Sequence, residues 1–140
     1  MALESVSVNW LAIIVATIVS FIFGWLWYGP LFGKIWVKSS GMSEKEMKQK
    51  KKEGMGKVLL WHFIGDLVMV YVLAMLIGWI GINEFGEVAM LGIYLGVGFL
   101  VAGPLLGDVL WKCRPWSFFW INTFYWILNF VIAGSVIVAF

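Results

Sequence analysis

The 140-residue sequence holds few charged residues, one cysteine, one histidine and three prolines. Charged residues make up 13% of the chain, whereas soluble domains carry about 25%, so a water-soluble core is excluded. The single cysteine, Cys113, excludes an internal disulfide and a metal site built from several cysteines. The sequence shows no paired carboxylates, Ser-His-Asp set or cluster of metal ligands. We therefore expect no enzyme, no cofactor and no bound metal.

Apolar sequence is what the chain has in abundance. Hydrophobic residues make up 62% of it, and the mean hydropathy is +0.93. A helix needs about 20 apolar residues to cross a bilayer. Four runs of that length occur, at residues 9–28, 57–80, 88–110 and 117–139. We predict an all-α, polytopic membrane protein, a four-transmembrane-helix bundle that forms a single membrane domain over residues 1–140 and whose first partner is the lipid bilayer.

Residues 31–56 form the one hydrophilic block. Within it Ser43 and Glu46 have the spacing of a capping box, which predicts a short polar helix between the first and second spans. The lysines of this block are able to bind anionic lipid headgroups, although fixing the topology is their simpler role. No fold that reads bases accompanies them, so we expect no nucleic-acid partner.

The distribution of positive charge predicts the orientation. Of the ten lysines and arginines, eight fall within residues 31–57 and two within 112–114. The positive-inside rule places the connections 31–56 and 111–116 in the cytoplasm and both termini outside. We therefore expect a multi-pass protein of the cell membrane, inner or plasma, with that orientation.

Two spans carry small residues at helical spacing, which lets neighbouring backbones approach closely. The first span has a ladder made of Ala12, Ala16, Ser20 and Gly24. The third span has Gly92, Gly96, Gly103 and Gly107, whose spacing predicts that all four lie on one helix face. Two such ladders exceed what one slender bundle needs. We therefore predict a homo-oligomer, with a dimer as our guess.

Two prolines, one just after the first apolar run and one within the third, predict breaks in the helices. Gly29-Pro30 is expected to end the first helix, because proline cannot continue it in the usual way. Pro104 is expected to kink the third helix and to free the carbonyl group of Leu100.

Asp66 is the one acidic residue deep inside an apolar run, and His62 precedes it by one turn on the same face. An acid in a span costs about 2.5–3.5 kcal/mol on insertion scales and usually faces a bundle interior or a polar cavity. Counting about 1.5 Å per residue, Asn129 reaches the depth of Asp66, and Asn122 reaches that of His62. Ser20 also lies near the middle of its span. We predict a polar strip inside the bundle made of His62, Asp66, Asn122, Asn129 and Ser20.

We expect Asp66 to be buried and hydrogen-bonded to His62 or to an asparagine. Loss of hydration favours the neutral carboxyl group, so Asp66 should be largely protonated when no cation is bound.

Two segments resemble a known family. They are VNWLAIIVATIVSFIFGWLWYGPLFGKIW at residues 8–36 and CRPWSFFWINTFYWILNFVIAGSVIVAF at residues 113–140. With their Trp-Tyr-Gly-Pro-Leu-Phe-Gly-Lys and Arg-Pro-Trp motifs, they resemble the bacterial and archaeal family of unknown function DUF1761. The resemblance implies a small integral membrane protein of four helices. It implies no activity and no site residues, so His62 and Asp66 rest on the physical argument alone.

Three functional classes remain open. The first is a transporter or channel in which His62 and Asp66 handle a proton, cation or small solute. The second is a structural or accessory membrane protein whose polar strip only fixes helix packing. The third is a membrane enzyme or haem carrier, with His62 and Met69 as haem ligands or two His62 residues across a dimer; a single histidine makes it the weakest. The cost of retaining a buried acid favours transport.

Overall fold

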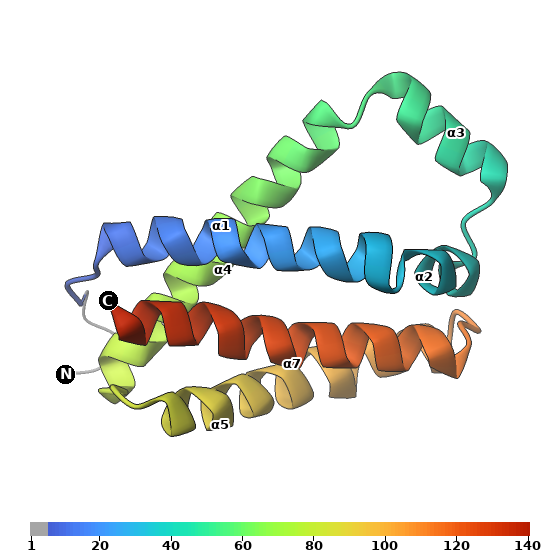
Figure 1. Ribbon diagram of the computed structural model, residues 1–140. Helices are drawn as coiled ribbons and strands as arrows, with labels where there is room; N and C mark the ends of the chain where they lie inside the picture. The colour runs from blue at the N-terminus through green and yellow to red at the C-terminus, as the bar shows by residue number, and fades with distance from the viewer. Residues whose placement is uncertain (1–5) are drawn as a thin grey trace.

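The computed structural model describes residues 6–140, and every regular element in that part of the chain is a helix (Figure 1). Residues 1–5, which belong to the N-terminus that we predict to lie outside the cell, are not in the described part of the chain. In chain order the elements are α1 (Trp10–Leu26), η1 (Trp27–Leu31), α2 (Gly33–Ser40), α3 (Glu44–Glu53), α4 (Gly56–Ile80), α5 (Phe85–Leu95), η2 (Gly96–Leu105), α6 (Leu106–Leu110) and α7 (Trp116–Ala139).

Four helical stretches are long and apolar enough to cross a membrane, which confirms the predicted fold class. They are Trp10–Leu31, Gly56–Ile80, Phe85–Leu110 and Trp116–Ala139, and no end differs by more than three residues from the predicted range. The first span consists of α1 and η1, and the third of α5, η2 and α6. The chain is therefore a four-span membrane protein.

Helix α7 is the centre of the bundle, since α1, α4, and the combined α5 and η2 all pack against it. The end of α7 and the start of α1 lie at one end of the bundle, as Figure 1 shows. The other end carries α2, α3 and the connection 111–115, and we call it the lysine-rich end. Near this end the first half of α4 leans away from α1 and α7 toward α3 (Figure 1).

The core fills the half of the bundle that lies away from the lysine-rich end. Ile13 and Ala16 of α1, Val70 and Leu73 of α4, and Ala133 of α7 are all buried there. Small residues on α1 allow the close approach that the first ladder predicts, because its four members are all buried. Tight contact between helices, rather than exclusion of water, stabilises this half of the bundle in lipid.

The first span does not end at Gly29-Pro30. It continues through Pro30 as the π-helical turn η1, in which the Phe32 N–H donates to the carbonyl oxygen of Trp27 at 2.9 Å. A wider turn moves backbone away from the proline ring, which in an α-helix would clash with a carbonyl group one turn back. Gly33 completes the turn, since a Cβ there would lie 2.6 Å from the carbonyl oxygen of Tyr28.

The third span also continues through its proline, Pro104, as a π-helix. This π-helix changes which glycines lie on the predicted face. A Cβ at Gly92 would lie 2.8 Å from a methyl carbon of Val131, and one at Gly96 would lie 2.8 Å from Ile127, so both pack on α7. The ten-residue π-helix η2 then follows and contains Pro104. Its wider turns alter the angular spacing of the residues. Gly103 and Gly107 therefore face open space within the described chain instead of continuing the packed face.

The predicted polar helix between the first two spans is present as α3. Ser43 caps it, with its Oγ accepting a hydrogen bond from the Glu46 N–H at 3.1 Å. No residue of α3 is buried, so this helix projects from the lysine-rich end without joining the core.

Candidate functional site

Asp66 lies where the buried stripe of α4 begins. The stripe continues at Val70, Leu73 and Ile77, spaced three or four residues apart, so all four residues share one helix face. Asp66 is 5% exposed. Its Oδ2 has no hydrogen-bond partner among residues 6–140. A buried carboxylate oxygen without a partner is unfavourable, which marks this position as a candidate functional site.

His62 stands one turn closer to the lysine-rich end. Its Nε2 lies 3.8 Å from Asp66 Oδ2, too far for the expected hydrogen bond. The two side chains differ sharply in exposure, at 56% for His62 and 6% for Asp66. His62 therefore lies at the mouth of the site and Asp66 at its buried end, and a modest side-chain rotation would bring them into contact.

The two asparagines make hydrogen bonds elsewhere, and neither bonds to Asp66. Asn129 is fully buried and accepts a hydrogen bond from Ser20 Oγ at 2.7 Å, while its Nδ2 lies 3.8 Å from Met69 Sδ. Asn122 accepts from Tyr28 Oη at 2.5 Å and donates to the Phe118 carbonyl oxygen at 2.7 Å. The predicted strip is thus two bonded groups with the unpartnered carboxylate of Asp66 outside both.

Two tyrosines that the predicted strip did not include complete the site. Tyr28 and Tyr125 have ring centroids 4.8 Å apart, and the hydroxyl group of Tyr125 lies close enough to Asp66 for an electrostatic interaction. Gly24 makes room for it, because a Cβ there would lie 2.9 Å from Tyr125 Oη. A signal was present in the sequence: Tyr28 extends the first ladder by four residues, and Tyr125 lies on the α7 face of both asparagines.

A cavity of about 440 Å³ extends from this site toward the lysine-rich end, between α1, α4 and α7. His62 and Asn122 are among its polar lining groups. Half of its twelve lining residues are phenylalanine, tyrosine or tryptophan: Phe21, Trp25, Tyr28, Trp36, Tyr125 and Trp126. Leu59 and His62 of α4, with the N-cap residue Met55, line the cavity on the same helix face that Asp66 continues. The carboxyl group of Asp66 therefore lies just beyond the deepest lining residue of that face.

The chemistry available here is that of one acid among weak donors and acceptors. A carboxyl group can hold a proton or form an ion pair with a cation, and an imidazole can accept or donate a proton at its two nitrogens. Within residues 6–140 no group of three His, Cys, Asp or Glu residues is placed to hold a metal ion. The arrangement therefore suits a single exchangeable positive charge.

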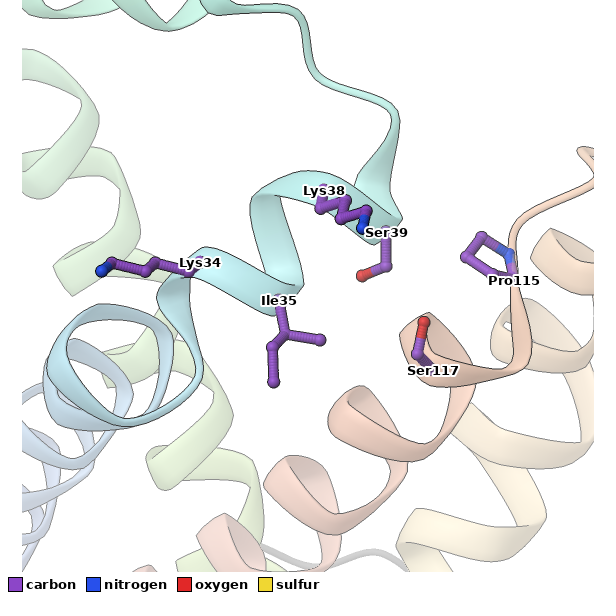
Figure 2. Close-up of a pocket in the computed structure, with 6 residues that line it drawn as sticks. All are labelled: Lys34, Ile35, Lys38, Ser39, Pro115 and Ser117. Atoms are coloured by element: carbon purple, nitrogen blue, oxygen red, sulfur yellow. The ribbon is translucent and has the colours of Figure 1, made fainter.

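Two other hollows lie outside this site. Figure 2 shows one of about 480 Å³ between α2 and the start of α7, with Ile35, Ser39 and Ser117 pointing into it. The amino group of Lys34 points away from that space, so the two lysines in its lining do not converge on one ligand (Figure 2). An apolar hollow of about 300 Å³ lies between α4, η2 and α7, with Met69 and Leu73 in its wall.

Comparison with known proteins gives a family but no function. The family described as "Protein of unknown function (DUF1761)" matches the chain over residues 11–138. Searches of curated proteins and of solved structures find no match. The match covers the α1–α7 bundle and the cavity with Asp66, and the chain is accordingly a member of the DUF1761 family.

Proposed function

We propose that this protein moves protons or small cations across the membrane and that Asp66 is the group that binds them. The observation that carries the proposal is the buried Oδ2 of Asp66, which has no hydrogen-bond partner in the described chain and belongs to the residue one helical turn beyond His62, a lining residue of the cavity. An unpaired charge in a low-dielectric interior is unfavourable, so this carboxyl group requires a proton or a cation. In a transport protein, the carboxyl group would bind a proton and a cation alternately.

The proposed path begins at the lysine-rich end and runs through the cavity. His62 is half exposed and lies 3.8 Å from the carboxyl group, so it is placed to pass a proton between the cavity and Asp66. On the other side of Asp66 the α4 stripe is packed in the core. Release toward that side therefore requires a conformational change, and the π-helical segment η2 is the proposed place for it, since such segments are frequent at functional sites.

Ion flux in proteoliposomes tests this function. Wild-type protein should carry protons or a monovalent cation down an imposed gradient, and Asp66→Asn should insert and fold but lose that flux. Asp108→Asn is the matched control, because Asp108 belongs to another span and forms an ion pair with Lys112 at 3.0 Å. Unchanged flux in Asp66→Asn, or none in the wild type against a broad ion panel, would contradict the proposal.

A structural or accessory role is the second candidate, and the hydrogen bonds of the asparagines favour it. Ser20–Asn129 and Tyr28–Asn122 both join the first span to α7, as expected of polar residues that fix helix register. Under this alternative, Asp66→Asn would leave flux absent or unchanged while substitutions of Asn129 would still destabilise the bundle.

We also propose that the protein lies in the cell membrane with the lysine-rich end in the cytoplasm and both termini outside. The positive charge on α2, α3 and the connection 111–115 supports this orientation and would place the lysines of α3 near anionic headgroups. Cys113 is exposed in that connection. A membrane-impermeant thiol reagent should label it only after cells are opened; rapid labelling of intact cells would overturn the orientation.

A homo-oligomer, with a dimer as the smallest form, is part of the proposal. Gly103 and Gly107 offer unfilled space on the third span, where another helix could approach closely. Native mass spectrometry in lipid particles should show a dimer or larger form that Gly103→Leu weakens. A strictly monomeric wild type at all concentrations would refute it.

A further inference from the structure

The cavity beside Asp66 has aromatic walls that binding of a bare inorganic ion does not require. We infer that it is a binding site for a hydrophobic organic cation, held by the aromatic walls and by Asp66 as its counter-ion. This inference rests on the proposed function and names the class of substrate that the same site would carry. A cavity of about 440 Å³ lies within the range of sites for drug-sized ligands.

Oxygen ligands are too few in the cavity for a hard metal cation. Ca²⁺ and Mg²⁺ take six or more oxygens, counting waters. Here the amide oxygen of Asn122 already accepts the hydroxyl group of Tyr28 at 2.5 Å, and its Nδ2 is bonded to Phe118. The phenol of Tyr125 remains in the lining, and the carboxyl group of Asp66 lies one turn beyond that lining on α4. One charged group beside a cavity with few free oxygens and many aromatic rings suits a cation whose charge is spread over organic groups.

The aromatic walls provide the rest of the recognition. Tyr28 lies at the centre of the wall, 4.8 Å from the ring of Tyr125 and 5.3 Å from that of Trp36. These neighbouring rings are inclined by 60° and 66°, so they form a corner instead of a parallel stack. A cation in such a corner can meet ring faces from more than one side, which is the arrangement that cation–π recognition uses.

An entry route for an amphiphilic molecule is visible at the first half of α4. Residues 56–62 are exposed around the whole helix, and Figure 1 shows this part of α4 leaning away from α1 and α7. Trp25, which lines the cavity, is 63% exposed on the facing span. The cavity therefore opens sideways toward lipid, from which a hydrophobic cation can enter without crossing an aqueous phase.

The site would hold one positive charge at a time. The titratable groups facing Asp66 are His62 on α4 and Tyr125 on α7, and Tyr28 of η1 lies behind them against Tyr125. When a monovalent cation enters, the O–H bond of the Asp66 carboxyl group breaks, its electron pair stays on the oxygen, and the proton leaves through the cavity. One proton is released for each cation bound.

Binding of tetraphenylphosphonium to the full-length protein in detergent tests the inference. Calorimetry in two buffers of different ionisation enthalpy gives both the affinity and the number of protons released. We expect saturable binding with about one proton released, weakening as the pH falls. Triphenylphosphine oxide, which carries similar rings without a net charge, should bind at least about tenfold more weakly.

Variants with matched controls locate the site. Asp66→Asn should weaken tetraphenylphosphonium binding at least about tenfold, whereas Asp108→Asn should leave it unchanged. Trp36→Leu and Trp126→Leu should each weaken it about fivefold, in the range expected for loss of one cation–π contact. Trp120→Leu removes an exposed tryptophan of α7 that does not line the cavity and should have no effect.

Equal affinity for the neutral compound, or wild-type affinity in Asp66→Asn, would overturn the inference, because the cavity would then be only an apolar surface. Flux of inorganic cations that depends on Asp66, without tetraphenylphosphonium binding, would also overturn it while leaving the proposed function intact. Binding with the expected variant pattern but without flux of any ion or of tetraphenylphosphonium would support this site and contradict the proposed function.

Discussion

The two halves of α4 present the same face to different surroundings. In the first half, Val58, Leu59 and His62 line the cavity. In the second half, Val70 and Leu73 are 0% and 3% exposed in the core. The same face of α4 therefore lines open space in its first half and is tightly packed in its second half.

Asp66 lies at the boundary between these halves, and its position shows why a buried acid is tolerated there. One turn further along, a carboxyl group would take the place of Val70 and be enclosed by Ile13, Leu73 and other core residues. One turn earlier it would be exposed beside Leu59 and Trp61. At the boundary it is shielded by the core on one side and lies one turn beyond the cavity residue His62 on the other. Packing stabilises one half of α4, and the other half is left open for a site.

The strongest test of this contrast compares two leucines of α4. Leu73→Ala removes a buried side chain and should lower the free energy of unfolding by about 2–4 kcal/mol. Leu59→Ala alters a side chain that is 42% exposed and should change it by about 0.5 kcal/mol or less. Unfolding by a denaturing detergent measures both. Similar losses at the two positions would show that the cavity half is packed, against this account.

The next test concerns the π-helical turn that shapes the cavity wall. Gly33→Ala places a Cβ 2.6 Å from the Tyr28 carbonyl oxygen and should destabilise the protein by about 1–3 kcal/mol. It should also move Trp36, a residue of the cavity wall, so its tryptophan emission should shift. Gly29→Ala, with nothing within 4 Å of the added Cβ, is the control. If both variants behave like the wild type, η1 does not hold the wall in place.

The smallest expected effect belongs to the hydrogen bond between α1 and α7. Ser20→Ala and Asn129→Ala should each destabilise the bundle modestly, and the double mutant should lose less than their sum. The coupling energy should be about 0.6 kcal/mol, the average for such bonds between membrane helices. Additive losses would mean that the bond contributes nothing. The same cycle at Ser20 and Asp66 should show no coupling.

The sequence predicted the fold well because its main signals are local. Apolar run length gave the four spans, and Ser43 with Glu46 gave the polar helix α3. The first small-residue ladder, including Ala12 and Gly24, lies buried on α1, because no irregularity interrupts that helix before residue 27. The glycines of the third span divide into two groups, since η2 changes the angular spacing after Gly96: Gly92 and Gly96 pack on α7, whereas Gly103 and Gly107 face open space within the described chain.

The candidate site was less predictable, because it depends on which helices meet and where. Depth along each span correctly grouped Ser20 with Asn129 in the middle of the bundle. It could not show that Asn122 would bond to Tyr28, or that the Oδ2 of Asp66 would have no hydrogen-bond partner in the described chain. Tyr28, Tyr125 and the tilt of α4 create the cavity, and the tilt has no signature in the sequence that we could identify.

The most direct test of the central claim is whether the carboxyl group of Asp66 can be reached and protonated within the membrane. Dicyclohexylcarbodiimide is a hydrophobic reagent that modifies protonated carboxyl groups, and peptide mass spectrometry locates its adduct. In folded protein in lipid we expect one adduct on Asp66, lost in Asp66→Asn, while the exposed acids of α3 remain unmodified. If Asp66 stays unmodified under conditions that label it after unfolding, the carboxyl group is closed off in the bundle, and the account of an accessible proton or cation site is wrong.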